Sequence, residues 1–225
     1  MTKQLVYKWV SALLCYPEQA LLDALPELRI LLAKMPETAK NSTALTAFLD
    51  YLTDTPLLEL QQNYVQTFDR NRSHALYIFE HIHGEDRDRG SAMVDLLEEY
   101  RKYGLELSDD ELPDYLPALL EFFAEIEPQA AQKLLADAVH VINHIAKKLD
   151  NSGSPYAVLL HTIVGLSPVK PLPLIEPPVR DMDEAMETFG PDVAGVEPLL
   201  KPRFSDRTKI KFYPQGTYKT QRGIK

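Results

Sequence analysis

The sequence predicts an all-α protein that has one helical domain and a proline-rich, basic C-terminal tail. Apolar residues recur at the helical period of about 3.6 along most of the first 166 residues. No β-hairpin signal and no fixed-period repeat interrupts this pattern. Nine of the 17 prolines lie in 168–214, where the run SPVKPLPLIEPPVRD favours an extended chain over a helix. We therefore place the helical domain at 1–166 and the tail at 167–225.

The apolar stripes and their start and stop signals give the expected helices in order. The first covers 3–15 and ends before Pro17, because a residue that precedes proline avoids the helical region. Pro26 is expected to end one short helix and to start the next, since proline fits the first helical turn. Pro128 opens the longest helix, which runs to about Leu149. The other expected helices begin near 42–43, 54–56, 88–91, 114 and 156, and a short one lies near 74–81 within a loop over 70–88.

Charge is distributed unevenly along the chain. The net charge is −9, but 199–225 hold eight basic residues and one acidic residue, so 1–198 hold 16 basic and 32 acidic residues and a net charge of −16. An acidic body disfavours nucleic acid and anionic membrane surfaces and attracts a basic partner. The basic segment is short and lies beside this body, so no nucleic-acid partner is expected.

Three features bear on the compartment. No run of about 18 apolar residues occurs, so we expect no membrane-spanning helix and no membrane insertion. The N-terminal stretch lacks a long apolar core and a small-residue cleavage site, which favours a first helix over a signal peptide. Cys15 is the single cysteine, which excludes an internal disulfide and fits a reducing cytoplasm.

The stretch 64–90 departs from the helical pattern and is the predicted functional site. Its sequence, YVQTFDRNRSHALYIFEHIHGEDRDRG, sets many ionisable side chains around an apolar island over 75–79. Ionisable groups beside a buried strip cost desolvation free energy unless they pair or bind a ligand. Tyr64 and Phe68 share one face of the helix that leads into this stretch, and they suit either the core or the wall of a groove.

The charged residues of this stretch leave alternatives open. His81 and His83 suit a metal site only on an extended segment, because on a helix they would point about 200° apart. Local hydrogen bonds that hold the loop are the favoured alternative. The charged residues over 85–89 are open to two interpretations. They are surface charge at a helix start, or their arginines form bidentate ion pairs with Asp69 or Glu80 that fix the loop.

These residues and those that follow resemble a known family. The sequence YVQTFDRNRSHALYIFEHIHGEDRDRGSAMVDLLEEYRKYGLEL, followed by ELPDYLPALLEFFAEI, is similar to the delta-subunit chaperones of respiratory nitrate reductase, the NarJ type. These belong to the all-helical redox-enzyme maturation chaperones that include TorD and DmsD. The resemblance is strongest over 57–127, and its most specific run, F-E-H-x-H-G-x-x-x-D-R-G, covers 79–90. It does not extend to the tail past Leu166.

The resemblance implies a TorD/NarJ-like bundle and a cytoplasmic chaperone that is not an enzyme. Such proteins bind the N-terminal segment of the apo catalytic (alpha) subunit of respiratory nitrate reductase and a second region of it. They leave before or as the alpha–beta complex docks on its membrane subunit. They keep this client competent to receive the molybdenum cofactor, bis-molybdopterin guanine dinucleotide, and an iron–sulfur cluster, and they hold neither stably themselves. Molybdenum-cofactor biosynthesis proteins are further expected partners.

A groove with an acidic rim is therefore expected to bind the client, because client leaders in this family are typically basic and apolar. No catalytic residue and no metal ligand is predicted. The alternatives are a generic helical adaptor and a helical metal-dependent hydrolase that uses Glu80, His81, His83 and Asp86. The residues expected to line or shape the groove are Tyr64, Phe68, Asp69, Glu80, His81, His83, Arg87, Asp88 and Arg89.

The tail suggests a second hypothesis. Residues 203–213, RFSDRTKIKFY, alternate basic residues with apolar and aromatic ones, which is the composition expected of a client leader. The tail would then occupy the groove as a tethered competitor. A disordered, solubilising end is the favoured alternative.

Overall fold

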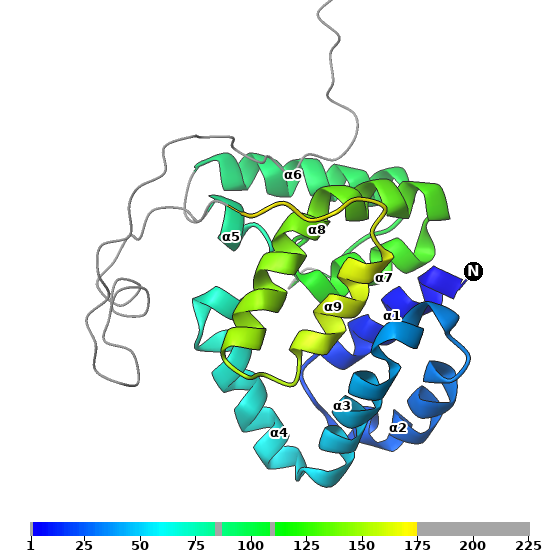
Figure 1. Ribbon diagram of the computed structural model, residues 1–225. Coiled ribbons are helices and arrows are strands. Elements are labelled where there is room, and N and C mark those ends of the chain that lie inside the picture. Colours follow the sequence, from blue (N-terminus) through cyan, green and yellow to red (C-terminus); the bar gives the residue numbers. More distant parts are fainter. Residues whose placement is uncertain (1, 84–86, 109–110, 175–225) are drawn as a thin grey trace, which may run out of the picture.

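The computed structural model describes residues 2–83, 87–108 and 111–174, and over these ranges the chain is helical and contains no β-strand (Figure 1). The all-α prediction is thereby confirmed. None of the described helices has the length and apolar character needed to cross a membrane. The α-helices are α1 (Thr2–Leu14), α2 (Gln19–Leu32), α3 (Ser42–Asp54), α4 (Leu57–Tyr64), α5 (Glu80–His83), α6 (Arg87–Lys102), α7 (Leu116–Glu125), α8 (Pro128–Asn151) and α9 (Ala157–Leu166). Short turns lie between them: the 3-10 turns η1 (Pro36–Asn41) and η3 (Arg72–His74), and the π-helical turn η2 (Val65–Asp69).

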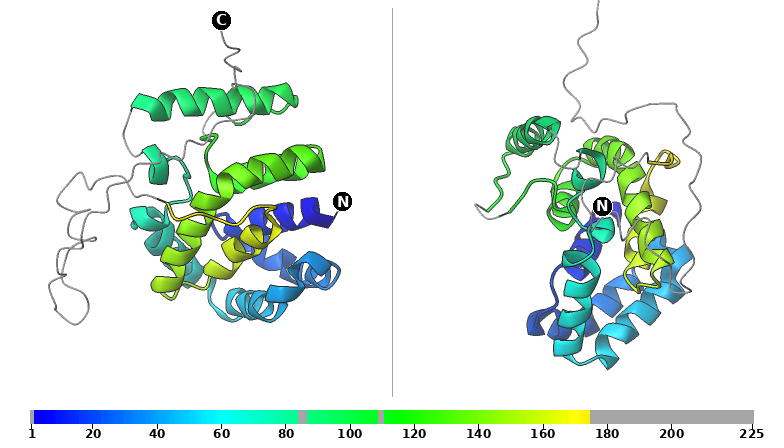
Figure 2. Two further views of the ribbon diagram at one scale, coloured as in Figure 1. Left: turned by 45° about the horizontal axis from the view of Figure 1, so that its top comes forward. Right: turned by 90° about the vertical axis from the view of Figure 1, so that its left-hand side faces the viewer.

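Helices α1, α7, α8 and α9 form the centre of the domain. α1 packs along α7 and also meets α9, and α8 packs along α9 (Figure 1, Figure 2). The sequence of α8 explains its place, because Pro128 fits the first helical turn and the buried residues after it recur at the helical period. These buried residues include Ala131, Leu134, Leu135, Ala138, Val141, Ile142, Ile145 and Leu149.

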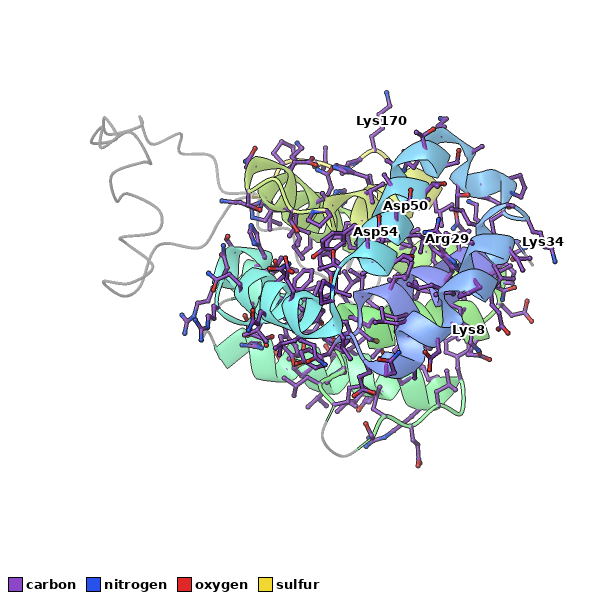
Figure 3. All side chains as sticks on the ribbon, turned by 90° about the horizontal axis from the view of Figure 1, so that it is seen from below. Lys8, Arg29, Lys34, Asp50, Asp54 and Lys170 are labelled. Atoms are coloured by element: carbon purple, nitrogen blue, oxygen red, sulfur yellow. The ribbon has the colours of Figure 1, made fainter. Side chains whose placement is uncertain are left out.

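α2 and α3 pack against each other beside this centre and carry an ion pair on their outer surface (Figure 3). Arg29 of α2 pairs with Asp50 of α3 at 2.7 Å between Nη2 and Oδ1, and its guanidinium also donates to Thr53 at 3.1 Å. Because both partners are substantially exposed to solvent, this pair contributes at most about 1 kcal/mol.

The expected break at Pro26 is wrong. α2 runs without interruption from Gln19 to Leu32 with Pro26 inside it. A proline inside a helix removes one backbone hydrogen bond, but the apolar stripe continues across it through Leu25 and Leu32, which are both buried. Burial of this stripe outweighs the lost hydrogen bond and keeps one helix where two were expected.

The end of α6 follows its sequence signal. Gly104 has a φ of +72°, the left-handed conformation that glycine adopts at low cost after a helix. The amide of Leu105 donates to the carbonyl of Tyr100 at 3.1 Å, which closes the last turn. The predicted stop at Gly104 is confirmed.

The chain leaves the helical domain after α9, which ends at Leu166. Residues 167–174 cross α8 as a coil (Figure 1), and the amide of Leu172 donates to His140 Nδ1 on α8 at 2.9 Å. The remainder of the predicted tail, 175–225, lies outside the described residues, and so does the hypothesis that 203–213 occupy the groove.

Candidate functional site

The predicted stretch lies at one edge of the molecule, where α4, η2, η3 and α5 follow one another (the left-hand edge in Figure 1, which faces the viewer in the right-hand view of Figure 2). The structure separates the nine predicted residues into three groups. Some belong to the core, some lie at the surface, and the side chains of Arg87 and Asp88, at the start of α6, lie outside the described part.

Tyr64 and Phe68 are core residues in this structure, with exposed fractions of 4% and 5%. The Tyr64 hydroxyl donates to the carbonyl of Leu14 at 2.9 Å, and the Phe68 ring lies 5.0 Å from the ring of Tyr156 between centroids. Both rings point into the core, so they support the site from its buried side. Both suit the core alternative that the sequence left open.

The histidines are held by local contacts. His81 is buried and its Nε2 lies 2.8 Å from the carbonyl oxygen of Ala75, while its ring meets the His144 ring of α8 at 5.8 Å between centroids. The ring of His83 packs on Phe79 at 5.7 Å between centroids. Within the described ranges no group of three or more His, Cys, Asp or Glu residues is placed to hold a metal ion, and Asp86 lies outside those ranges.

The acidic residues of the stretch lie nearer the surface. Asp69 is exposed at the end of the π-helical turn. Glu80 accepts a hydrogen bond from Arg89 at 3.4 Å between Oε1 and Nη2, which ties α5 to the first turn of α6. This is the arginine contact that the sequence offered as one of two alternatives, although it is a single contact and not a bidentate fork.

Asp114 is a site residue that the sequence analysis missed. A helix was expected to begin near 114, but α7 begins at Leu116 with Tyr115 in the N-cap position, and Asp114 is fully buried. Its Oδ2 accepts the backbone N–H of Phe79 at 3.1 Å, and its Oδ1 has no hydrogen-bond partner in the described structure. Burial raises the pKa of this carboxyl to about 6, against the opposing effects of the Phe79 amide and the Arg89 charge. An aspartate before an apolar helix gives no sequence signal of such burial.

Tyr77 and Tyr115 lie side by side because their backbone segments pair. Tyr77 and Tyr115 form an isolated antiparallel bridge, with Leu116 N donating to Leu76 O at 2.8 Å and Ile78 N donating to Asp114 O at 3.1 Å. Residues opposite each other without mutual hydrogen bonds are the closer type of antiparallel pair, so their side chains touch. The ring centroids of Tyr77 and Tyr115 are 5.3 Å apart.

This pair extends a row of aromatic side chains across the site. The Tyr115 hydroxyl lies 3.3 Å from the Tyr64 hydroxyl, and the Tyr64 ring meets the Tyr16 ring edge-on at 5.5 Å between centroids. Tyr64 is buried, Tyr77 and Tyr115 are half-buried, and Tyr16 is 43% exposed. We call Tyr16, Tyr64, Tyr115 and Tyr77 the aromatic row.

An open depression of about 280 Å³ lies at the Tyr16 end of the row, on the outer face of α4 and η2. Leu58, which is 67% exposed, and Val65 give it an apolar lining. A depression with apolar side chains in its lining offers space for an apolar side chain of a ligand. It lies on the outer face of α4, whereas the sequence analysis placed the groove on the face that carries Tyr64 and Phe68. The lining residues are Tyr16, Leu58, Gln61, Gln62, Val65, Gln66 and Arg70.

The helical fold resembles that of a solved protein structure. A solved structure described as a putative redox enzyme maturation protein from Archaeoglobus fulgidus superposes with a TM-score of 0.54 over 72% of this chain and 91% of that one, at 22% sequence identity. At this identity the likeness establishes the fold alone.

The sequence comparisons are more specific. The profile of the family described as nitrate reductase delta subunit matches residues 35–161. The chain is 40% identical, over 91% of its length and 83% of the relative's, to the nitrate reductase molybdenum cofactor assembly chaperone NarJ of Escherichia coli K12. It is 34% identical to the probable chaperone NarW of the same strain, over 72% of this chain and 68% of that one. It is 30% identical to the probable NarJ of Bacillus subtilis, over 72% and 88%.

The chain belongs to the nitrate reductase delta subunit family. The three relatives described above are named as assembly chaperones and not as catalysts, so the chain is a chaperone and not an enzyme. The hydrolase alternative from the sequence analysis is thereby set aside.

Proposed function

We propose that this chain is the dedicated chaperone that prepares the catalytic subunit of a respiratory nitrate reductase to receive its molybdenum cofactor. The observation that carries the proposal is the 40% identity, over 91% of the chain, to a protein named for that assembly role. The chaperone acts in the cytoplasm on the apo catalytic subunit and on its alpha–beta complex, with molybdenum-cofactor biosynthesis proteins as further partners. Bis-molybdopterin guanine dinucleotide and an iron–sulfur cluster pass into the client, and the chaperone retains neither.

The N-terminal segment of the catalytic subunit is the proposed ligand of the candidate site. A leader that is basic and apolar suits a body whose residues 1–198 carry a net charge of −16. The depression beside Leu58 offers space for apolar side chains, and the 43% exposed Tyr16 ring offers further apolar surface. Of the predicted residues, Asp69, Glu80 and Arg89 lie where a ligand can reach them, while Tyr64, Phe68 and His81 support the wall.

Calorimetric titration of the full chain with a synthetic N-terminal peptide of its catalytic subunit tests this ligand. We expect saturable binding with a Kd of about 1 μM or below. Leu58→Ser should weaken it at least about tenfold, because binding buries the leucine side chain and burial of such a side chain is worth about 1.5–3 kcal/mol. Ile30→Ser on α2, where Ile30 is 56% exposed, is the matched control and should leave the Kd unchanged. Absence of saturable binding by the unaltered chain would refute the proposed ligand.

Loading of the client tests the role itself. The catalytic subunit is expressed with and without this chain in a host that lacks its own delta-subunit chaperones, and molybdenum and iron are measured in the purified subunit. We expect a molybdenum content near one atom per subunit only when the chain is present. Equal molybdenum contents in the two preparations would contradict the assembly role.

A further inference from the structure

The close contact of the half-buried Tyr77 and Tyr115 rings is not explained by the proposed leader site. Both rings are half-buried and lie 5.3 Å apart between centroids, tilted by 35°. The bridge between their backbones and the contact of the Tyr115 hydroxyl with Tyr64 fix the position of the pair. The face of a tyrosine ring is electron-rich, and such faces attract ammonium and guanidinium groups.

Carboxyl groups from several elements act electrostatically on Tyr77. Burial raises the pKa of the Tyr77 hydroxyl, and the charges of Asp114, Asp69, Glu80 and Glu111 raise it further. Asp69 and Glu111 are exposed and form no ion pair with any residue that the structure describes, whereas Glu80 is partly neutralised by Arg89. The charges that act most strongly on Tyr77 are therefore negative.

Asp114 precedes Tyr115 in the chain and adds a buried carboxyl to this region. It is fully buried, and its Oδ1 accepts no hydrogen bond in the described part of the chain. A buried, incompletely bonded carboxylate is costly unless a positive charge approaches it. Arg89 is the described cation that acts on it, and its guanidinium is hydrogen-bonded to Glu80.

We propose that the Tyr77–Tyr115 pair, together with the carboxyl groups of Asp69, Glu80, Glu111 and Asp114, is a binding site for one basic side chain, a guanidinium or ammonium group, of the bound leader. This inference rests on the proposed function for the source of the cation. Tyr115 contacts the buried Tyr64, whose ring meets Tyr16 in the lining of the depression at Leu58. In the proposed complex one ligand segment places an apolar side chain in the depression and a basic side chain over Tyr77.

Paired variants test the aromatic part of the cation site. Tyr77→Leu keeps an apolar side chain but removes the ring face, and it should weaken leader binding about threefold to tenfold. Tyr77→Phe keeps the face and should bind within about twofold of the unaltered chain. Tyr103→Leu, a 41% exposed tyrosine that follows α6, controls for the loss of a surface ring. Equal affinities of Tyr77→Leu and Tyr77→Phe, with unchanged melting temperatures, would overturn the proposal.

Conservative changes test the acidic part without altering the core. Asp69→Asn with Glu111→Gln should weaken leader binding by about threefold to fivefold and should reduce its dependence on salt. Glu27→Gln, exposed on α2, is the control. An unchanged salt dependence in the double variant would contradict a role for these carboxyl groups.

A small probe separates this inference from the proposed function. N-acetyl-arginine amide, titrated at millimolar concentration into the full chain, should shift the ring signals of Tyr77 in NMR spectra, whereas the neutral citrulline analogue should not. Tyr77→Phe assigns those signals. If the arginine probe shifts them while the leader peptide fails to bind, the leader assignment is wrong and the cation site stands. If arginine and citrulline act alike, the cation site is wrong even where the leader binds.

Discussion

Asp114→Asn should change how the stability of the protein depends on pH. The carboxyl is fully buried and its pKa is raised to about 6 from an ordinary value of 3.8, mainly by burial. An acid whose pKa is raised in the folded state favours folding when it is protonated. Its contribution is therefore fully present below the unfolded pKa and is lost as the pH rises through about 6.

The size of the effect follows from the shift. A difference of one pKa unit corresponds to about 1.4 kcal/mol, so the full contribution of Asp114 is about 3 kcal/mol. About 2 kcal/mol of this contribution should be lost between about pH 4.5 and about pH 7.5. The rest is lost below this range, because the range begins above the ordinary pKa of the carboxyl. The asparagine side chain carries no charge over this range and can still accept the Phe79 amide, so its own effect on stability does not vary with pH.

Urea unfolding followed by circular dichroism at a series of pH values measures the effect. The difference in unfolding free energy between Asp114→Asn and the unaltered chain should shift by about 2 kcal/mol in favour of the variant as the pH rises. Asp54→Asn, an exposed carboxyl change on α3 (Figure 3), controls for the general effect of removing one negative charge. Parallel stability profiles for the unaltered chain and Asp114→Asn would refute the reasoning.

Two further predictions concern buried and exposed hydrogen bonds. Tyr64→Phe removes a buried hydroxyl that donates to the carbonyl at the end of α1, and it should lower the unfolding free energy by about 1–2 kcal/mol, as urea unfolding would measure. Tyr103→Phe, at an exposed tyrosine, should have no such effect, and equal losses in the two variants would count against the assignment of Tyr64 to the core. His140 must be unprotonated at Nδ1 to accept the hydrogen bond of the Leu172 amide. Burial lowers the pKa of His140, so this hydrogen bond persists above the lowered pKa and is lost when the pH falls below it. Hydrogen exchange should show a protected Leu172 amide that His140→Phe deprotects, and equal protection in both proteins would contradict the contact.

The all-helical class was predictable because each helix carries its own apolar stripe. The residues of α8 recur at the helical period after Pro128, and this local pattern is sufficient to predict a long amphipathic helix. Gly104 was equally predictable, since the left-handed turn after a helix favours glycine for a local steric reason. α2 was not, because whether Pro26 breaks a helix depends on what the flanking leucines pack against.

The sequence by itself determined the helical class, the acidic body and the resemblance over 57–127, because period, charge and motif are properties of the chain. The tertiary structure alone decided which face of α4 turns inward, and it placed Tyr64 in the core and Leu58 at the surface. It also paired Tyr77 with Tyr115, which lies 38 positions further along the chain, and it buried Asp114. These pairings depend on contacts between segments distant in the sequence, and no local pattern encodes the desolvation and backbone pairing that create them.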